Sequence, residues 1–232
     1  MKAYIECGHG EGGDPGAVNN ELIEHQMTLV TGESLSQRLK ELGWEIMLEQ
    51  GNLEMTENAR VANNFGADIY LSVHYNAGGG ERGEVIYSWE NGALKLAEAV
   101  ANGLYNSNQP NVKIYKSKAN SSGTAEYFGS LRVSTMPAVI IEPCFIDHPT
   151  DRARADTLEE QKIIGYNIAD AIHLAYGGAI MPEQWKIDIM NKGIKYGLIS
   201  AEANHKPDDV ATKWFMIAVV SNLLEKYGLA VK

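Results

Sequence analysis

Short apolar runs that alternate with longer amphipathic segments constrain the fold of this chain more than any other feature. Alternation of short strands with helices of 10 to 20 residues produces crossover connections, which favour a mainly parallel sheet covered on both faces. The sequence therefore predicts an α/β fold. The predicted strands cover residues 3–7, 44–48, 68–73, 84–88 and 137–142, and the predicted helices cover 21–42, 56–65, 93–105 and 158–176, with a loop-rich stretch at 106–123.

The dipeptide Gly177-Gly178, followed by Pro182, predicts a domain boundary. We therefore expect a first domain at residues 1–178 and a small helical domain at residues 182–232, with helices near 183–196 and 208–227. Chains as short as the second segment often need a partner or another support to fold. We therefore expect residues 182–232 to pack against the first domain, a second copy of the chain or a wall polymer.

Charge and composition exclude several function classes. The chain has 20 Lys+Arg against 30 Asp+Glu, a formal charge of −10, which disfavours nucleic acid as a partner. The sequence has no run of about 18 apolar residues that would cross a membrane, and its 2 Cys cannot form a disulfide framework. The first ten residues have no signal-peptide pattern, so we expect synthesis in the cytoplasm.

Ionisable side chains follow three of the predicted strands. His9 lies in a glycine-rich loop after the first strand, His74 follows the third, and Glu142 ends the last. In an open parallel sheet the carboxyl ends of the strands form the ligand-binding edge, so these groups are expected to converge. Two imidazoles and a carboxylate suit a catalytic Zn²⁺, which needs three protein ligands. Either Glu21 or Glu24 can supply the third ligand, and helical spacing alone does not choose between them.

A nucleotide-binding site is the main alternative for the glycine-rich loop. Residues 8–13 fit the pattern G-x-G-x-x-G after a strand, and Glu49 ends the second strand. In a dinucleotide site, however, the helix begins within the glycines, so that its N-terminus meets the pyrophosphate. Here Asp14-Pro15-Gly16 forms a turn and delays the helix, which disfavours the nucleotide interpretation.

Several separated motifs together resemble one family, the zinc-dependent N-acetylmuramoyl-L-alanine amidases of bacterial autolysins and phage endolysins. The resemblance covers about residues 2–176. It rests on Tyr4–Gly10 (YIECGHG), Gly13–Ala17 (GDPGA), Glu24 with Leu29, Arg60–Asn63 (RVAN), Ser72–Ala77 (SVHYNA) and Met136–Ile146 (MPAVIIEPCFI).

This resemblance implies a three-layer α/β/α domain and one Zn²⁺ per chain, bound by His9, Glu24 and His74. It also implies Glu142 as the catalytic residue. The expected reaction is hydrolysis of the amide bond between N-acetylmuramic acid and L-alanine in peptidoglycan, which lyses the cell wall. Glu6 stands where the family commonly has another residue, and it is expected to orient a ligand histidine.

The biological setting follows from the same resemblance. A phage endolysin that reaches the wall after release from the cytoplasm is expected, with an autolysin of mother-cell lysis as the alternative. Another zinc peptidase or deacylase, or a wall-binding module without catalysis, are further alternatives, and the reaction product distinguishes them. Residues 182–232 faintly resemble a unit that binds wall polymers, and a helical cap or a dimer contact is nearly as well supported.

Overall fold

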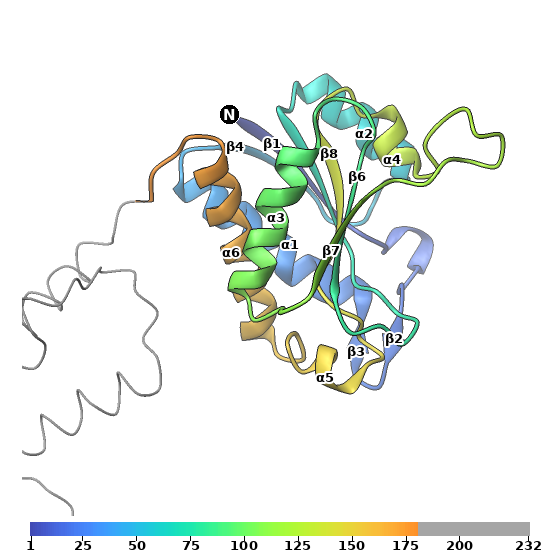
Figure 1. Ribbon diagram of the computed structural model, residues 1–232, viewed down its shortest axis with the longest axis vertical. Helices are drawn as coiled ribbons and strands as arrows, with labels where there is room; N and C mark the ends of the chain where they lie inside the picture. Colours follow the sequence, from blue (N-terminus) through green and yellow to red (C-terminus); the bar gives the residue numbers. More distant parts are fainter. Residues whose placement is uncertain (181–232) are drawn as a thin grey trace, which may run out of the picture. The chain divides into compact units, whose positions relative to one another are not determined.

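The computed structural model describes residues 1–180, in which a six-stranded sheet separates two layers of helices (Figure 1). The sheet has the strand order β4-β1-β5-β8-β6-β7. Its strands are β1 (Lys2–Cys7), β4 (Glu45–Glu49), β5 (Ile69–Val73), β6 (Gly83–Tyr87), β7 (Val112–Lys116) and β8 (Ala138–Glu142).

The sheet is mixed but mostly parallel. β4, β1, β5 and β8 run parallel to one another, and β7 is parallel to β6. The one antiparallel pair joins β6 to β8, with Glu84 opposite Glu142. The carboxyl ends of β1, β5 and β8 therefore meet at the same edge as the beginning of β6.

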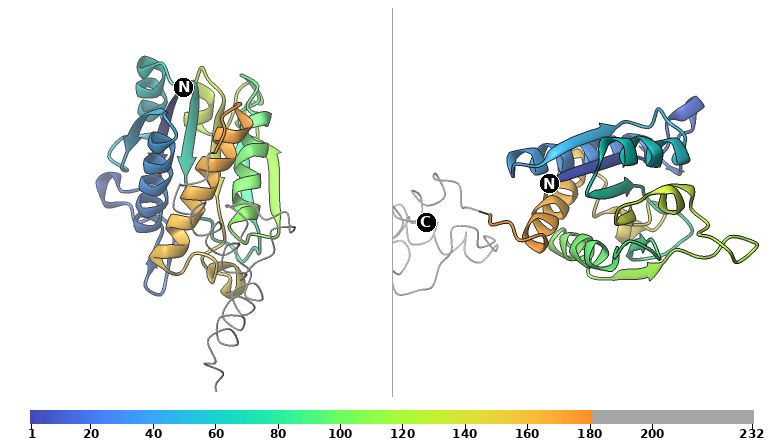
Figure 2. Two further views of the ribbon diagram at one scale, coloured as in Figure 1. Left: turned by 90° about the vertical axis from the view of Figure 1, so that its left-hand side faces the viewer. Right: turned by 90° about the horizontal axis from the view of Figure 1, so that it is seen from above.

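Helices cover both faces of the sheet, as the two views in Figure 2 show. Alternate residues of each strand point to opposite faces, so the sheet builds two separate cores. Ile5, Leu71 and Ile141 belong to the larger core, and Tyr4, Tyr70 and Ile140 belong to the smaller one. The larger core packs against α1 (Glu24–Glu41), α3 (Leu94–Asn106) and α6 (Leu158–Ala175), and the smaller packs against α2 (Met55–Phe65) and α4 (Gly129–Val133).

This architecture confirms the predicted three-layer α/β/α class, but two boundaries were wrong. The helix predicted from residue 21 begins at Glu24, because the preceding residues pair as a hairpin of β2 (Val18–Asn19) and β3 (Leu22–Ile23). The stretch predicted as loop at 106–123 contains β7, an edge strand whose side chains are only partly buried. Partial burial explains why its apolar pattern is weak. Two short helices, α4 and α5 (Pro149–Arg152), were not predicted.

The predicted helical domain at 182–232 lies outside the described residues, and the boundary at residue 178 stays a prediction. Among residues 1–180, no helix has the length and apolar character needed to span a bilayer. Cys7 and Cys144 are buried free thiols, and Cys144 belongs to the larger core.

Candidate metal centre

His9 is held by an unusual backbone conformation in the loop after β1. Its φ of 67° lies in the left-handed region, which non-glycine residues seldom adopt and which often marks functional sites. The imidazole is fixed at both nitrogens: Nδ1 lies 2.8 Å from Oδ2 of Asp14, and Nε2 lies 3.0 Å from Oε1 of Glu24. Asp14 thus sets the ring orientation, and Nε2 is directed toward Glu24.

Glu24 is the first residue of α1 and is almost completely buried. Its Oε2 accepts a hydrogen bond from the backbone N–H of Ala17 at 2.7 Å, and its Oε1 accepts one from that of Tyr75 at 3.0 Å. Burial alone would raise the pKa of Glu24, but hydrogen bonds from both histidines and these amides hold the pKa well below its usual range. Glu24 is therefore a fixed anion inside the protein.

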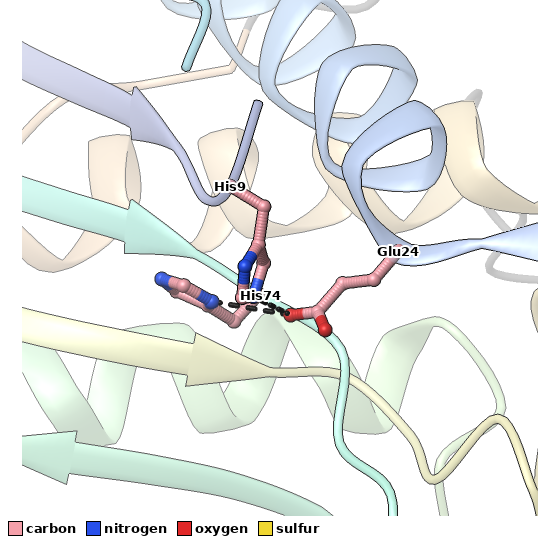
Figure 3. Close-up of side chains that lie close together, drawn as sticks. All are labelled: His9, Glu24 and His74. Atoms are coloured by element: carbon pink, nitrogen blue, oxygen red, sulfur yellow. Dashed lines mark hydrogen bonds and ion pairs between the residues drawn. The ribbon is translucent and has the colours of Figure 1, made fainter. Parts of the chain in front are cut away.

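His74 completes the cluster from the end of β5. Its Nδ1 lies 3.1 Å from Oε1 of Glu24, and its backbone N–H donates to the carbonyl of Ile141 on β8. Figure 3 shows the three side chains converging from the β1 loop, the start of α1 and the end of β5. One donor atom from each of the three lies within 4.8 Å of the others.

The donor set and the surrounding space fit a zinc ion. Two imidazole nitrogens and a carboxylate oxygen form a common ligand set of catalytic zinc, which leaves one position open. A Cβ atom at Gly16 would lie 2.6 Å from both Oε2 of Glu24 and a carbon of the His9 ring, and one at Gly8 would lie 2.3 Å from the His74 ring. Any side chain at these two positions would fill the space around the donors.

Glu142 ends β8, beside the strand that carries His74. Its Oε2 is buried and has no hydrogen-bond partner among the described residues. Burial raises the pKa of Glu142 to about 7, opposed by the charge of His74 and assisted by those of Glu24 and Glu84. A buried carboxylate oxygen without a partner is costly, so this partly buried group has the properties of a proton acceptor and donor that works near neutral pH.

Comparison with known proteins identifies the family. The model of the N-acetylmuramoyl-L-alanine amidase family (Amidase_3) matches residues 4–173. The chain belongs to this amidase family.

Individual relatives agree with the family match. The chain is 31% identical over 157 residues to the N-acetylmuramoyl-L-alanine amidase CwlM of Bacillus licheniformis, covering 65% of this chain and 59% of the relative. It is 32% identical over 163 residues to a sporulation-specific N-acetylmuramoyl-L-alanine amidase of Bacillus subtilis, covering 68% and 61%. An endolysin of Bacillus phage SPP1 is 28% identical over 160 residues, covering 65% and 56%. The chain thus spans about three fifths of the length of these curated relatives.

The fold agrees as well. The solved structure of Cwp6 from Clostridium difficile superimposes with a TM-score of 0.69 and 26% identity, covering 75% of this chain and 29% of that one. The solved N-acetylmuramoyl-L-alanine amidase AmiC2 of Nostoc punctiforme superimposes with a TM-score of 0.64 and 24% identity, covering 76% of this chain and 96% of that one, so the described domain has the fold of an amidase catalytic domain.

Of the two candidate carboxylates, the structure brings only Glu24 to the histidines. Glu24 joins the two histidines, whereas Glu21 is exposed in the turn of the β2–β3 hairpin. The expected role of Glu6 stays a prediction: its Oε2 accepts a hydrogen bond from the hydroxyl of Tyr70, and Asp14 is the carboxylate that contacts Nδ1 of His9. Tyr70 lies on the neighbouring strand β5, opposite Tyr4, so the hydrogen bond of Glu6 joins two strands on one face of the sheet.

Sequence reasoning missed a polar group beside Glu142. Glu84 is buried, and it receives hydrogen bonds from Nε of Arg82 at 2.6 Å and from the hydroxyl of Tyr115 at 2.6 Å. Tyr115 belongs to the unpredicted strand β7, and the pairing of Glu84 with Glu142 depends on an antiparallel register. Neither relation is visible in the sequence, although a carboxylate inside an apolar strand was a signal that a partner was needed.

Proposed function

We propose that this protein hydrolyses the amide bond between N-acetylmuramic acid and L-alanine in peptidoglycan, with one Zn²⁺ held by His9, Glu24 and His74. The proposal rests on one observation above all. Three fitting donor atoms lie together at the edge of the sheet, and the unpartnered carboxylate of Glu142 lies on the adjacent strand. The family of the chain supports the same reaction.

A zinc ion at this site supplies Lewis-acid chemistry, which polarises a carbonyl and lowers the pKa of water. The residues of the chain supply the rest. Asp14 orients the ring of His9, and the two backbone amides on Glu24 fix its carboxylate. Glu142 accepts a proton from the attacking water and delivers it to the departing L-alanine nitrogen. Such proton transfer contributes typically about 10²- to 10⁴-fold to the rate.

Substitution of Glu142 by Gln tests the assignment. We expect Glu142→Gln to bind zinc with the wild-type stoichiometry but to release amine from purified cell walls at least about 100-fold more slowly. The matched control is Glu90→Gln, because Glu90 is exposed and follows the opposite end of β6. Near wild-type amine release by Glu142→Gln would contradict the role of Glu142.

The reaction product tests the reaction class. An amidase releases free amino groups from the wall without new reducing sugar ends, and a peptidase that cuts within the stem leaves L-alanine attached to the muramic acid. Metal analysis of the intact protein, and of His74→Ala, tests the centre independently of activity. We expect about one zinc per wild-type chain and a loss of zinc in the variant.

We also propose that the protein acts as a phage endolysin, with lysis of a mother cell by an autolysin as the alternative. Its relatives include a phage endolysin and a sporulation-specific amidase, which supports both settings. In each of them the enzyme reaches the wall after release. Expression in a bacterial host, with and without a separately supplied membrane pore, tests this idea. Lysis that does not depend on the pore would contradict it.

Residues 182–232 are proposed to bind wall polymers. Pelleting of the intact protein with purified walls, compared with the Trp185→Ala and Trp214→Ala variants, tests this proposal. Equal pelleting of all three proteins would contradict it.

A further inference from the structure

Arg82 lies next to the proposed catalytic centre but has no role in the mechanism above. It immediately precedes β6, and Glu84, two residues later, stands opposite Glu142 on β8. Residues that face each other across neighbouring strands point to the same side of the sheet, with Cβ atoms about 4.5–5.5 Å apart. Arg82 therefore reaches the face of the sheet that carries Glu142, on the far side of Glu84.

The guanidinium of Arg82 is held in one orientation. Nε donates to Oε1 of Glu84 at 2.6 Å, and Nη2 contacts the same oxygen. The ring of Phe145 lies under the guanidinium, 4.8 Å from its central carbon. The backbone N–H of Arg82 donates to Oδ2 of Asp151, which is completely buried. A side chain fixed in this way loses little conformational entropy when it binds a ligand.

Part of the guanidinium remains available. Arginine has five N–H donors, and no hydrogen bond or ion pair within 1–180 uses Nη1 of Arg82. The side chain is 39% exposed, so these donors are accessible. A second cation adds to the local charge: Lys113 stands opposite Glu84 on β7, with its ammonium 4.8 Å from the centre of the Tyr115 ring. The free end of a planar guanidinium is suited to bind a carboxylate.

If the proposed function is correct, the substrate carries free carboxylates only on the peptide side of the scissile amide. The lactyl carboxyl of muramic acid is consumed in the scissile amide, so the ionised carboxylates of the glycan–peptide unit belong to the peptide. The guanidinium is bonded to Glu84, which stands directly opposite Glu142, so the width of one side chain separates it from the proposed catalytic carboxylate. A peptide extends about 3.3–3.6 Å per residue. The carboxylate of the residue after L-alanine is therefore within reach.

We propose that Arg82 binds the free α-carboxylate of the second stem residue and makes the enzyme selective for it. The competing explanation is that Arg82 only neutralises Glu84. Neutralisation of Glu84 involves no contact with the substrate. Loss of this neutralisation in an Arg82 variant would therefore slow the hydrolysis of every substrate by the same factor. Selectivity between two substrates that differ only in this carboxylate separates the two explanations.

The test uses the intact zinc-loaded protein and two soluble muramoyl peptides, which differ only by a free carboxylate or a carboxamide at the second residue. We expect the wild type to prefer the carboxylate by about tenfold in kcat/KM, mainly through KM, because a hydrogen bond to a charged group is lost with the carboxamide. Arg82→Gln should lose about tenfold on the carboxylate and less than about twofold on the carboxamide. Arg82→Lys should retain part of the preference, since it keeps the charge but not the planar fork.

Arg60→Gln is the matched control, because the guanidinium of Arg60 pairs with Glu57 on the exposed side of α2. It should leave both rates unchanged. Equal losses of Arg82→Gln on both substrates, or a wild type without preference, would overturn the inference while amine release by the wild type leaves the proposed function intact. A wild type that releases amine from neither peptide nor from purified walls overturns the proposed function and this inference with it. If Arg82→Gln does not fold, the substrate preference of the wild type decides.

Discussion

Replacement of Gly165 by alanine sets two physical effects against each other. Gly165 lies within α6, and alanine stabilises the interior of a helix by about 1 kcal/mol relative to glycine. A Cβ atom at this position, however, would lie 2.3 Å from the carbonyl oxygen of Thr31 and 2.8 Å from the backbone nitrogen of Leu35 in α1. Both contacts are with main-chain atoms, which cannot move without moving the helix.

The crowding decides the sign. The two helices must separate by roughly 1 Å to restore an ordinary van der Waals distance. Overpacking of this kind costs typically about 1–3 kcal/mol, and a contact with a rigid main chain belongs at the upper end. After the gain in helix propensity, we expect Gly165→Ala to lower the free energy of unfolding by about 2 kcal/mol. In a domain of this size that corresponds to a decrease in Tm of about 4–8 °C.

The assay is thermal unfolding of the intact protein, with and without added zinc. Lys162→Ala on the exposed side of α6 is the control, and it should change the stability by less than about 0.5 kcal/mol. Because α1 begins at Glu24, movement of this helix should also weaken zinc binding. A Tm for Gly165→Ala equal to or above that of the wild type would refute the packing argument, since helix propensity would then be the larger effect.

Two further predictions concern the metal centre. Asp14→Asn should lower zinc affinity about tenfold, because the carboxylate that orients His9 is lost; competition with a chelator measures this, and an unchanged affinity would contradict it. The hydrogen bond with Glu24 raises the pKa of His9 to about 9, so the metal-free fold favours protonated His9. The contribution of protonated His9 to the free energy of unfolding is complete below about pH 6.5 and is lost as pH rises toward 9. The free energy of unfolding falls by at most about 1.4 kcal/mol per pH unit for one proton. Denaturant unfolding in chelator should show this decline, and His9→Gln should reduce it; an identical slope in both proteins would argue against the coupling.

The central part of the fold was predictable because its strands are buried on both faces. Residues 69–73 and 138–142 are largely apolar, interrupted only by Ser72 and ended by Glu142, as is typical of strands in a parallel sheet, and both are adjacent central strands. Strands that are only partly buried have a weaker apolar pattern and are harder to predict from the sequence. β7 has intermediate or exposed side chains throughout, and the hairpin before Glu24 consists of strands of only two residues. Neither pattern separates a strand from a loop.

In the candidate site, too, one part was predictable from the sequence and another was not. His9 and His74 lie together as expected, because strand ends at one edge of a parallel sheet converge whatever their separation in sequence, and Glu24 joins them from the start of α1. The partner of His9 could not be predicted in the same way. Asp14 contacts the imidazole of His9, whose backbone is left-handed, and Glu6 in β1 is bonded to Tyr70. Such choices depend on local geometry that residue spacing does not determine.

The reversed direction of β6 determines which groups surround Glu142. If β6 ran parallel to β8, its carboxyl end near Ser88 would lie at the edge of the sheet that carries the candidate metal centre. Because β6 is antiparallel, its beginning lies there instead and brings Arg82 and Glu84 to the proposed catalytic carboxylate. Glu84 contributes a negative charge that helps to raise the pKa of Glu142, and Arg82 supplies a fixed positive charge in an otherwise acidic group of side chains. The antiparallel register therefore sets a cation, Arg82, against the pair of carboxylates formed by Glu84 and Glu142, and this charge offsets part of the repulsion that an anionic peptide stem would meet there.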